Sequence, residues 1–217
     1  MPLPQTVRRL APDRLRYSVR LRALAVGSGL VPPRSMHSVA ESELLAELAR
    51  GRRTAVEIGV YEGSSAVVLA GALPAGAALH LIDPFGENPT LLPGWAGVEG
   101  ATRRVVGRAA RRGEGPRVVW HVERSADAAA AWCEPVDLVF IDGDHSEAGC
   151  RLDWELWSPF VPPGGVVLFH DATGPEALPG PRAVFEDLFR SGDSPAGWRI
   201  STEVDTAVAV ERTAADG

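Results

Sequence analysis

The sequence predicts an α/β fold with a doubly wound, seven-stranded sheet that is mostly parallel and ends in an antiparallel hairpin. Short apolar runs rich in β-branched residues alternate with helical segments, a pattern typical of βαβ units with helices on both faces of a sheet. Only Val204, Asp205 and Thr206 join the last two runs, and a link this short predicts a hairpin, because a parallel crossover needs many more residues. The predicted strands cover residues 55–58, 78–82, 118–122, 136–141, 166–169, 198–203 and 207–211.

Helices are predicted between these strands from their start and stop signals. Ser38 with Glu41 three residues later forms a capping box, and Leu44, Leu45 and Leu48 then give the segment a helical apolar face. The predicted helices cover residues 39–50, 64–73, 100–112, 125–133, 146–157 and 182–190.

The N-terminal segment differs from the rest of the chain. Residues 13–26 alternate arginines with apolar residues, which indicates a loosely amphipathic helix, and the breaker G-S-G-L-V-P-P follows. We expect residues 1–35 to form a helical arm that serves as a homodimer contact or as a lid. Residues 36–217 are expected to form a single main domain.

The composition excludes several functional classes. The formal net charge is −6, whereas proteins that bind nucleic acid through phosphate contacts normally carry a basic balance. The sequence lacks the run of about 18 apolar residues that a spanning helix needs. Its two cysteines are too few for a disulfide framework. We therefore expect a cytoplasmic protein that binds neither nucleic acid nor a membrane and acts on a small or neutral substrate.

A glycine-bearing turn, V-E-I-G-V-Y-E-G-S-S, follows the first predicted strand. Gly59 and Gly63 allow the backbone to approach a ligand closely, and Ser64 and Ser65 lie where the free N–H groups of a helix start attract an anion. The glycine spacing departs from the G-x-G-x-x-G of dinucleotide folds, which counts against NAD. Asp83 ends the next strand in L-I-D-P-F, where its two oxygens suit a ribose diol. These stretches predict a nucleotide-like cofactor.

Four segments, taken in order and spacing, resemble one enzyme family: E-I-G-x-x-x-G-S-S, L-I-D-P-F, V-D-L-V-F-I-D-G-D-H-S and P-P-G-G-V-V-L-F-H-D. Together they resemble the class I S-adenosylmethionine-dependent methyltransferases, which have a Rossmann-like fold. I-D-G-D-H and F-H-D resemble the metal-dependent O-methyltransferases of sugars and other small molecules, particularly the macrocin-type group. The resemblance covers roughly residues 36–211. It implies methyl transfer to a sugar hydroxyl of a glycoside, polysaccharide or natural product, and a methylated mannose polysaccharide is one such acceptor.

The resemblance also implies residues that bind S-adenosylmethionine. It places Glu57 and Gly59 at the methionine pocket and Asp83 at the ribose. Arg124 and Ser125 match the stretch that flanks adenine. A short segment containing Met36 and His37 stands over the sulfonium in related enzymes, and either serine of 64 and 65 would meet the methionine carboxylate. The implied cofactor-binding set is Met36, Glu57, Gly59, Gly63, Ser64, Ser65, Asp83, Arg124, Ser125 and Asp142.

Two neighbouring strands are predicted to end in acidic and imidazole side chains. Asp142 ends one, and His170 and Asp171 end the other, so these side chains can converge across about one strand spacing, ~5 Å. Carboxylate oxygens suit Mg²⁺ or a similar hard cation, whereas imidazole binds Mn²⁺ and other transition ions better. The resembling group usually carries two acidic residues, or Asp-Asn, where this chain has His170-Asp171. We expect a divalent metal, Mg²⁺ with Mn²⁺ as the alternative, at Asp142, His170 and Asp171. Asp142 and Asp171 are the preferred ligands, and Asp144 is an alternative to His170.

A histidine is expected to act as the general base on the acceptor hydroxyl. His145 is preferred because imidazole titrates near neutrality, and His170 is its rival. Capping of the next helix is the alternative role for His145. Two other functions stay open, a metal-independent methyltransferase in which either histidine works unaided, and a non-catalytic adenosyl-binding module. The presence of Asp142, His145 and Asp171 together argues against the second.

Overall fold

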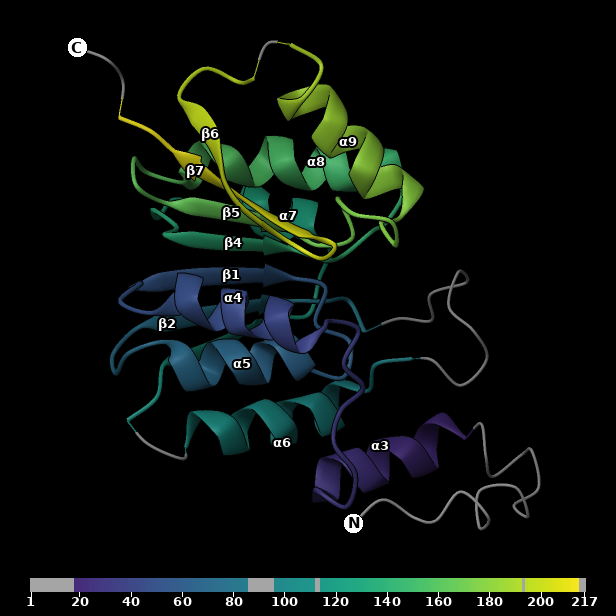
Figure 1. The fold of residues 1–217 in the computed structure, drawn as a ribbon. Coiled ribbons are helices and arrows are strands. Elements are labelled where there is room, and N and C mark those ends of the chain that lie inside the picture. The colour runs from purple at the N-terminus through teal and green to yellow at the C-terminus, as the bar shows by residue number, and fades with distance from the viewer. Residues whose placement is uncertain (1–17, 86–95, 112–113, 193, 215–217) are drawn as a thin grey trace.

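Seven strands of the described chain form one mixed sheet in the order β3-β2-β1-β4-β5-β7-β6 (Figure 1). The computed structural model describes residues 18–85, 96–111, 114–192 and 194–214. The first five strands are parallel, and β7 pairs antiparallel with both β5 and β6. Their bounds are β1 Thr54–Ile58, β2 Ala78–Ile82, β3 Arg117–His121, β4 Leu138–Ile141, β5 Val166–Phe169, β6 Trp198–Val204 and β7 Ala207–Arg212.

Helices cover both faces of this sheet (Figure 1). One face carries α4 (Val39–Ala49), α5 (Ser64–Ala72) and α6 (Glu99–Ala110). The other carries α7 (Ser125–Ala130), α8 (Glu147–Trp157) and α9 (Pro179–Phe189). None of the helices within the described residues is long and apolar enough to cross a membrane.

The core consists of two apolar layers, one on each face of the sheet. In β4, Leu138 and Phe140 pack against the layer that contains α4 and α5, whereas Val139 and Ile141 pack against the layer that contains α8 and α9. Each of these four side chains is at most 4% exposed. Burial on both faces explains why the strand is a continuous apolar run rather than an alternating one. The predicted fold class is confirmed.

Several element boundaries differ from the prediction for local reasons. β4 begins at Leu138 rather than at residue 136, because the Val136 N–H donates to the Phe160 carbonyl outside the strand ladder. α9 begins earlier than expected, at Pro179, because proline fits the first helical position, where no backbone N–H is needed.

The N-terminal helix α3 (Val19–Ser28) packs beside α6 and holds the glycine-bearing turn. Arg108 of α6 donates to the Gly27 carbonyl at 2.6 Å, near the end of α3. Arg22 of α3 donates two hydrogen bonds, of 2.6 and 2.7 Å, to the carboxylate of Glu62. Glu62 lies between Gly59 and Gly63, so α3 is hydrogen-bonded to the segment that is predicted to bind the cofactor. Residues 1–17 of the expected arm lie outside the described residues, and its role as a dimer contact or lid stays a prediction.

We expect Arg22→Ala to lower the free energy of unfolding by about 2 kcal/mol, because hydrogen bonds to charged groups contribute about 1.5–3 kcal/mol and the Glu62 side chain is only 7% exposed. Urea denaturation measures this change. The control is Arg20→Ala, an exposed arginine of the same helix, which should change the free energy by less than about 0.5 kcal/mol. Equal losses in the two variants would contradict the assigned anchor.

Candidate functional site

The carboxyl ends of β1, β4 and β5 lie side by side at one edge of the sheet. The strand order reverses between β1 and β4, and in open α/β sheets ligands bind in the crevice beyond the strand ends at such a point. Gly59 follows β1 with φ 88°, and a Cβ there would lie 2.1 Å from the Asp142 carbonyl oxygen. Gly63, also left-handed, precedes α5. The turn therefore needs glycine both for its backbone conformation and for its close contact with β4.

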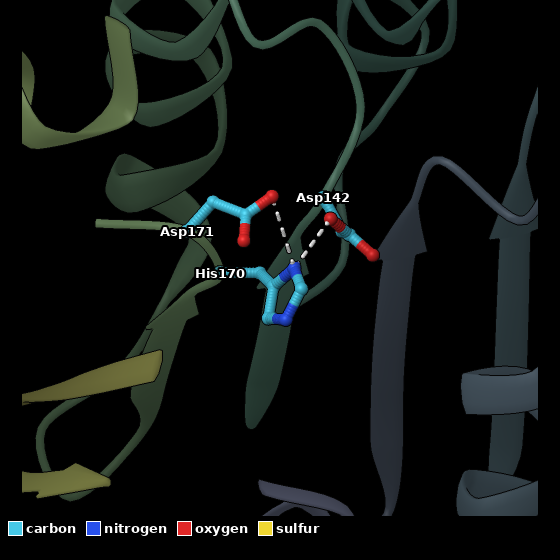
Figure 2. Close-up of side chains that lie close together, drawn as sticks. All are labelled: Asp142, His170 and Asp171. Carbon is cyan, nitrogen blue, oxygen red and sulfur yellow. Dashed lines mark hydrogen bonds and ion pairs between the residues drawn. The ribbon is translucent and has the colours of Figure 1, made fainter. Parts of the chain in front are cut away.

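Asp142, His170 and Asp171 form a compact cluster beyond β4 and β5. Figure 2 shows the imidazole of His170 directed at both carboxylates: its Nδ1 lies 3.0 Å from Asp142 Oδ1 and 3.5 Å from Asp171 Oδ2. Asp171 adopts a left-handed backbone with φ 55°, which aspartate tolerates better than most residues. The three side chains each offer one donor atom, and these atoms lie within 4.8 Å of one another. The expected convergence across neighbouring strands is therefore present.

His145 adds a second imidazole to the cluster. Its Nε2 lies 3.3 Å from Asp142 Oδ1 and 3.5 Å from Asp171 Oδ2, and its side chain is 40% exposed. The N-cap residue of α8 is Ser146, whose hydroxyl accepts the Gly149 N–H at 3.0 Å. The capping role considered for His145 is therefore not needed.

The charges of this cluster shift the pKa of its members. Burial raises the pKa of Asp142, but hydrogen bonds from His145 and His170 outweigh burial and hold that pKa far below its ordinary value. Burial lowers the pKa of His170, but the hydrogen bond to Asp142 and the charges of Asp142, Asp171 and Glu41 outweigh it and raise that pKa to about 9. The hydrogen bond to Asp142 raises the pKa of His145. Without a metal ion, His170 is therefore an imidazolium among carboxylates at neutral pH.

Glu41 is a part of the cluster that the sequence did not indicate. Its Oε1 accepts the backbone N–H and the hydroxyl of Thr206 at 2.8 and 2.6 Å, and its Oε2 lies 3.6 Å from His170 Nε2. The capping box identified Glu41 only as a helix-start residue, a role it also fills. Its contact with Thr206 joins positions 165 residues apart, and no local pattern signals such a contact.

The segment expected over the cofactor lies at the same edge. The ring of His37 packs edge-on against His170, with 5.5 Å between ring centroids, and lies 6.3 Å from Phe140. Met36 is 56% exposed. His37 therefore reaches the cluster directly, while the role of Met36 in binding the sulfonium stays a prediction.

Glu57 and Ser65 form a buried pair at the glycine-bearing turn. The Ser65 hydroxyl donates to Glu57 Oε1, whereas Oε2 has no hydrogen-bond partner within the described residues. Burial raises the pKa of Glu57 well above its ordinary value. A buried carboxyl oxygen of this kind suits a cationic ligand group such as an ammonium. The Ser65 hydroxyl is thus engaged with Glu57, and the expected contact of Ser64 or Ser65 with the methionine carboxylate stays a prediction.

Asp83 holds the same turn from the neighbouring strand. Its carboxylate accepts the backbone N–H groups of Val60 at 2.9 Å, Tyr61 at 2.8 Å and Phe85 at 2.7 Å. A carboxylate offers about four acceptor positions, and the described residues fill three of them; the contact with a ribose hydroxyl stays a prediction.

Arg124 and Ser125 lie where α7 begins, beyond β3. Arg124 is exposed and is the N-cap residue of α7. The Ser125 hydroxyl accepts the indole N–H of Trp157 at 2.8 Å. Their expected contacts with adenine stay predictions.

Comparisons with known proteins identify the family. A family model described as a methyltransferase domain matches residues 56–172, from β1 to the residue after Asp171. The chain belongs to this methyltransferase-domain family. The matched segment contains both the glycine-bearing turn and the Asp142–His170–Asp171 cluster, so the site lies within the methyltransferase domain itself.

Solved structures share the fold at low sequence identity. The O-methyltransferase TomG from Streptomyces achromogenes, solved in complex with SAM, is 23% identical with a TM-score of 0.59, and the likeness covers 91% of this chain and 90% of that chain. An O-methyltransferase from Bacillus cereus in complex with SAH is 18% identical with a TM-score of 0.58 over 96% of each chain. Cofactor-bound Rv0187 from MTB is 21% identical with a TM-score of 0.59 over 89% of each chain.

In metal-free protein, we expect the stabilisation that His170 provides to depend on pH. Because its pKa rises from 6.5 to about 9 on folding, this stabilisation is fully present below pH 6.5 and is lost as pH rises through about 9. One pKa unit corresponds to about 1.4 kcal/mol, so the stabilisation is on the order of 3 kcal/mol. Urea denaturation of wild type and His170→Asn with a chelator should give a larger difference at low pH than at high pH. A pH-independent difference would contradict the imidazolium.

Proposed function

We propose that the protein is an S-adenosylmethionine-dependent O-methyltransferase that acts on a sugar hydroxyl with the help of a divalent metal ion and a histidine base. The observation that carries this proposal is the convergence of Asp142, His170 and Asp171 beside the glycine-bearing turn of a methyltransferase domain. The descriptions of TomG and the Bacillus cereus protein as O-methyltransferases, with SAM and SAH bound, support the reaction and the cofactor. The sugar acceptor rests on the resemblance of I-D-G-D-H and F-H-D to the macrocin-type group.

The chain offers suitable partners for the methionine part of the cofactor at two points. When bound, S-adenosylmethionine would supply an electrophilic methyl group: the acceptor oxygen would form a bond to the methyl carbon as the bond from that carbon to sulfur breaks, which leaves S-adenosylhomocysteine. Glu57 Oε2, buried and without a partner among the described residues, suits the methionine ammonium. Ser64 and the N-terminus of α5 suit the methionine carboxylate. Asp83 fixes the intervening turn through backbone N–H groups.

The donor set fits a metal ion that accepts mixed oxygen and nitrogen ligands. A divalent cation held by Asp142, His170 and Asp171 would act as a Lewis acid that lowers the pKa of the acceptor hydroxyl. Asp142 remains ionised because its pKa is far below neutrality. Mg²⁺ prefers oxygen ligands, whereas the imidazole nitrogen of His170 favours Mn²⁺ or another transition ion.

The proton of the acceptor hydroxyl passes to His145 in this proposal. Nε2 of His145 faces Asp142 and Asp171, which leaves Nδ1 as the atom that accepts the proton. The carboxylates stabilise the imidazolium that forms, and the 40% exposure of the side chain allows contact with a substrate. His170 is a poorer base for this step because its side chain is only 2% exposed.

One observation favours a metal-independent variant of the same reaction as the second candidate. The imidazolium of His170 already places a positive charge beside Asp142 and Asp171. That charge offsets part of the negative charge of the cluster without a metal ion, and in this variant His145 takes the proton unaided.

We expect chelation to abolish methyl transfer and Mn²⁺ to restore it more fully than Mg²⁺, because the nitrogen donor favours Mn²⁺. The measurement is a mass-spectrometric screen of glycoside acceptors for the gain of one methylene, with calorimetry of S-adenosylmethionine binding beside it. Activity that is indifferent to the chelator would favour the metal-independent candidate. Failure to bind S-adenosylmethionine would overturn the proposal as a whole.

We expect His145→Ala to lower kcat by about 10²- to 10⁴-fold, the usual contribution of general-base catalysis, while Mn²⁺ affinity changes little. The control is Glu155→Gln, which removes an exposed carboxylate from α8 and should leave both quantities unchanged. Steady-state kinetics and Mn²⁺ titration measure the two effects. Loss of Mn²⁺ affinity in His145→Ala would instead make His145 a metal ligand.

A further inference from the structure

Glu41 lies on the opposite side of the His170 ring from Asp142 and Asp171. Its Oε2 is 3.6 Å from His170 Nε2, which has no hydrogen-bond partner within the part of the chain that the structure describes. Both side chains are buried, with exposed fractions of 2% for His170 and 5% for Glu41. Two carboxylates therefore face Nδ1 of the imidazole, and a third faces Nε2.

The carboxylate of Glu41 is held firmly in this position. Oε1 accepts the N–H and the hydroxyl of Thr206, in the link between β6 and β7, and Oε2 accepts the Ser38 N–H at 2.7 Å. The Thr206 hydroxyl also lies 3.4 Å from Asp171 Oδ1. These contacts fix Glu41 relative to both the start of α4 and the end of β5, so it can orient a ring that lies between them.

An imidazole that binds a metal through one nitrogen commonly directs its other N–H at a carboxylate, which fixes the ring orientation and makes the ligating nitrogen more basic. We propose that Glu41 is a positioning residue: its carboxylate accepts Nε2–H of His170 and so directs Nδ1 of the ring toward Asp142 and Asp171. Nδ1 then completes the metal site as a nitrogen donor, and this donor makes the site select a transition ion over Mg²⁺. This inference rests on the metal site of the proposed function. It also explains how a histidine can act as a metal ligand at position 170, because Glu41 fixes the ring through the nitrogen that does not face the metal.

The test measures Mn²⁺ binding to the purified full chain by the electron paramagnetic resonance signal of free Mn²⁺. We expect Glu41→Gln to weaken Mn²⁺ binding about 10- to 100-fold, the usual cost of losing a ligand's outer partner, and to weaken Mg²⁺ binding less. The control is Ser38→Ala, which removes the hydroxyl that accepts the Glu41 N–H but leaves the Glu41 carboxylate. It should lower the melting temperature without changing Mn²⁺ affinity.

A double-mutant cycle separates positioning from general damage to the fold. In a His170→Asn background, Glu41→Gln should no longer weaken Mn²⁺ binding, since the ring through which Glu41 acts is absent. Thr206→Val provides a second variant in case Glu41→Gln does not fold. It removes one of the bonds that hold the carboxylate and should weaken Mn²⁺ binding a few-fold, in the same direction.

Nuclear magnetic resonance of histidine-labelled protein with diamagnetic Zn²⁺ supplies a direct signature. Nε2–H of His170 should exchange slowly with solvent in wild type and faster in Glu41→Gln, whereas Ser38→Ala should resemble wild type. Unchanged Mn²⁺ affinity in Glu41→Gln, or an equal loss in the His170→Asn background, would overturn the role of Glu41 and leave the metal site standing. Absence of Mn²⁺ binding by wild type would remove the metal site and this inference together.

Discussion

The site depends on the parallel pairing of β1, β4 and β5, which places the carboxyl ends of three adjacent strands at one edge of the sheet. The pairing brings the glycine-bearing turn after β1 against Asp142 after β4, so closely that Gly59 has no room for a side chain. It also places His170 beside Asp142. A change of one residue in the register of β5 would turn His170 to the opposite face of the sheet and separate the cluster.

The same geometry concentrates negative charge that the protein must neutralise. Asp142, Asp171 and Glu41 all lie within 3.6 Å of a ring nitrogen of His170. Carboxylates gathered in a partly buried site repel one another and raise each other's pKa, and an imidazolium or a metal ion relieves that repulsion. Metal binding and stability would therefore be coupled here, because a metal ion at Nδ1 would have to replace the proton that stabilises the unliganded cluster.

The sequence predicted those features that follow from local pattern and strand order. Buried strands, the terminal hairpin and the convergence of Asp142 with His170 and Asp171 all follow from apolar runs that end in polar residues at one edge. The contacts made by Glu41 with Thr206 and by Arg22 with Glu62 were not predictable, because they join elements far apart in the chain through side chains whose partners only tertiary packing determines. The role of Asp83 was predictable only in part. Its position at a strand end was evident, but its three bonds to backbone N–H groups depend on how the turn folds back.

The pairing of His170 with Glu41 gives a physical reason for an imidazole rather than a carboxylate at position 170. A carboxylate at position 170 would enter a buried space that already contains the carboxylate of Glu41, itself held by three hydrogen bonds. Two buried carboxylates at short range cannot both remain ionised at neutral pH. An imidazole resolves this conflict, since one nitrogen can face Glu41 while the other faces Asp142 and Asp171. The residue at position 170 and the residue at position 41 are therefore best understood as a unit, in which a buried acid on α4 makes histidine the more stable neighbour.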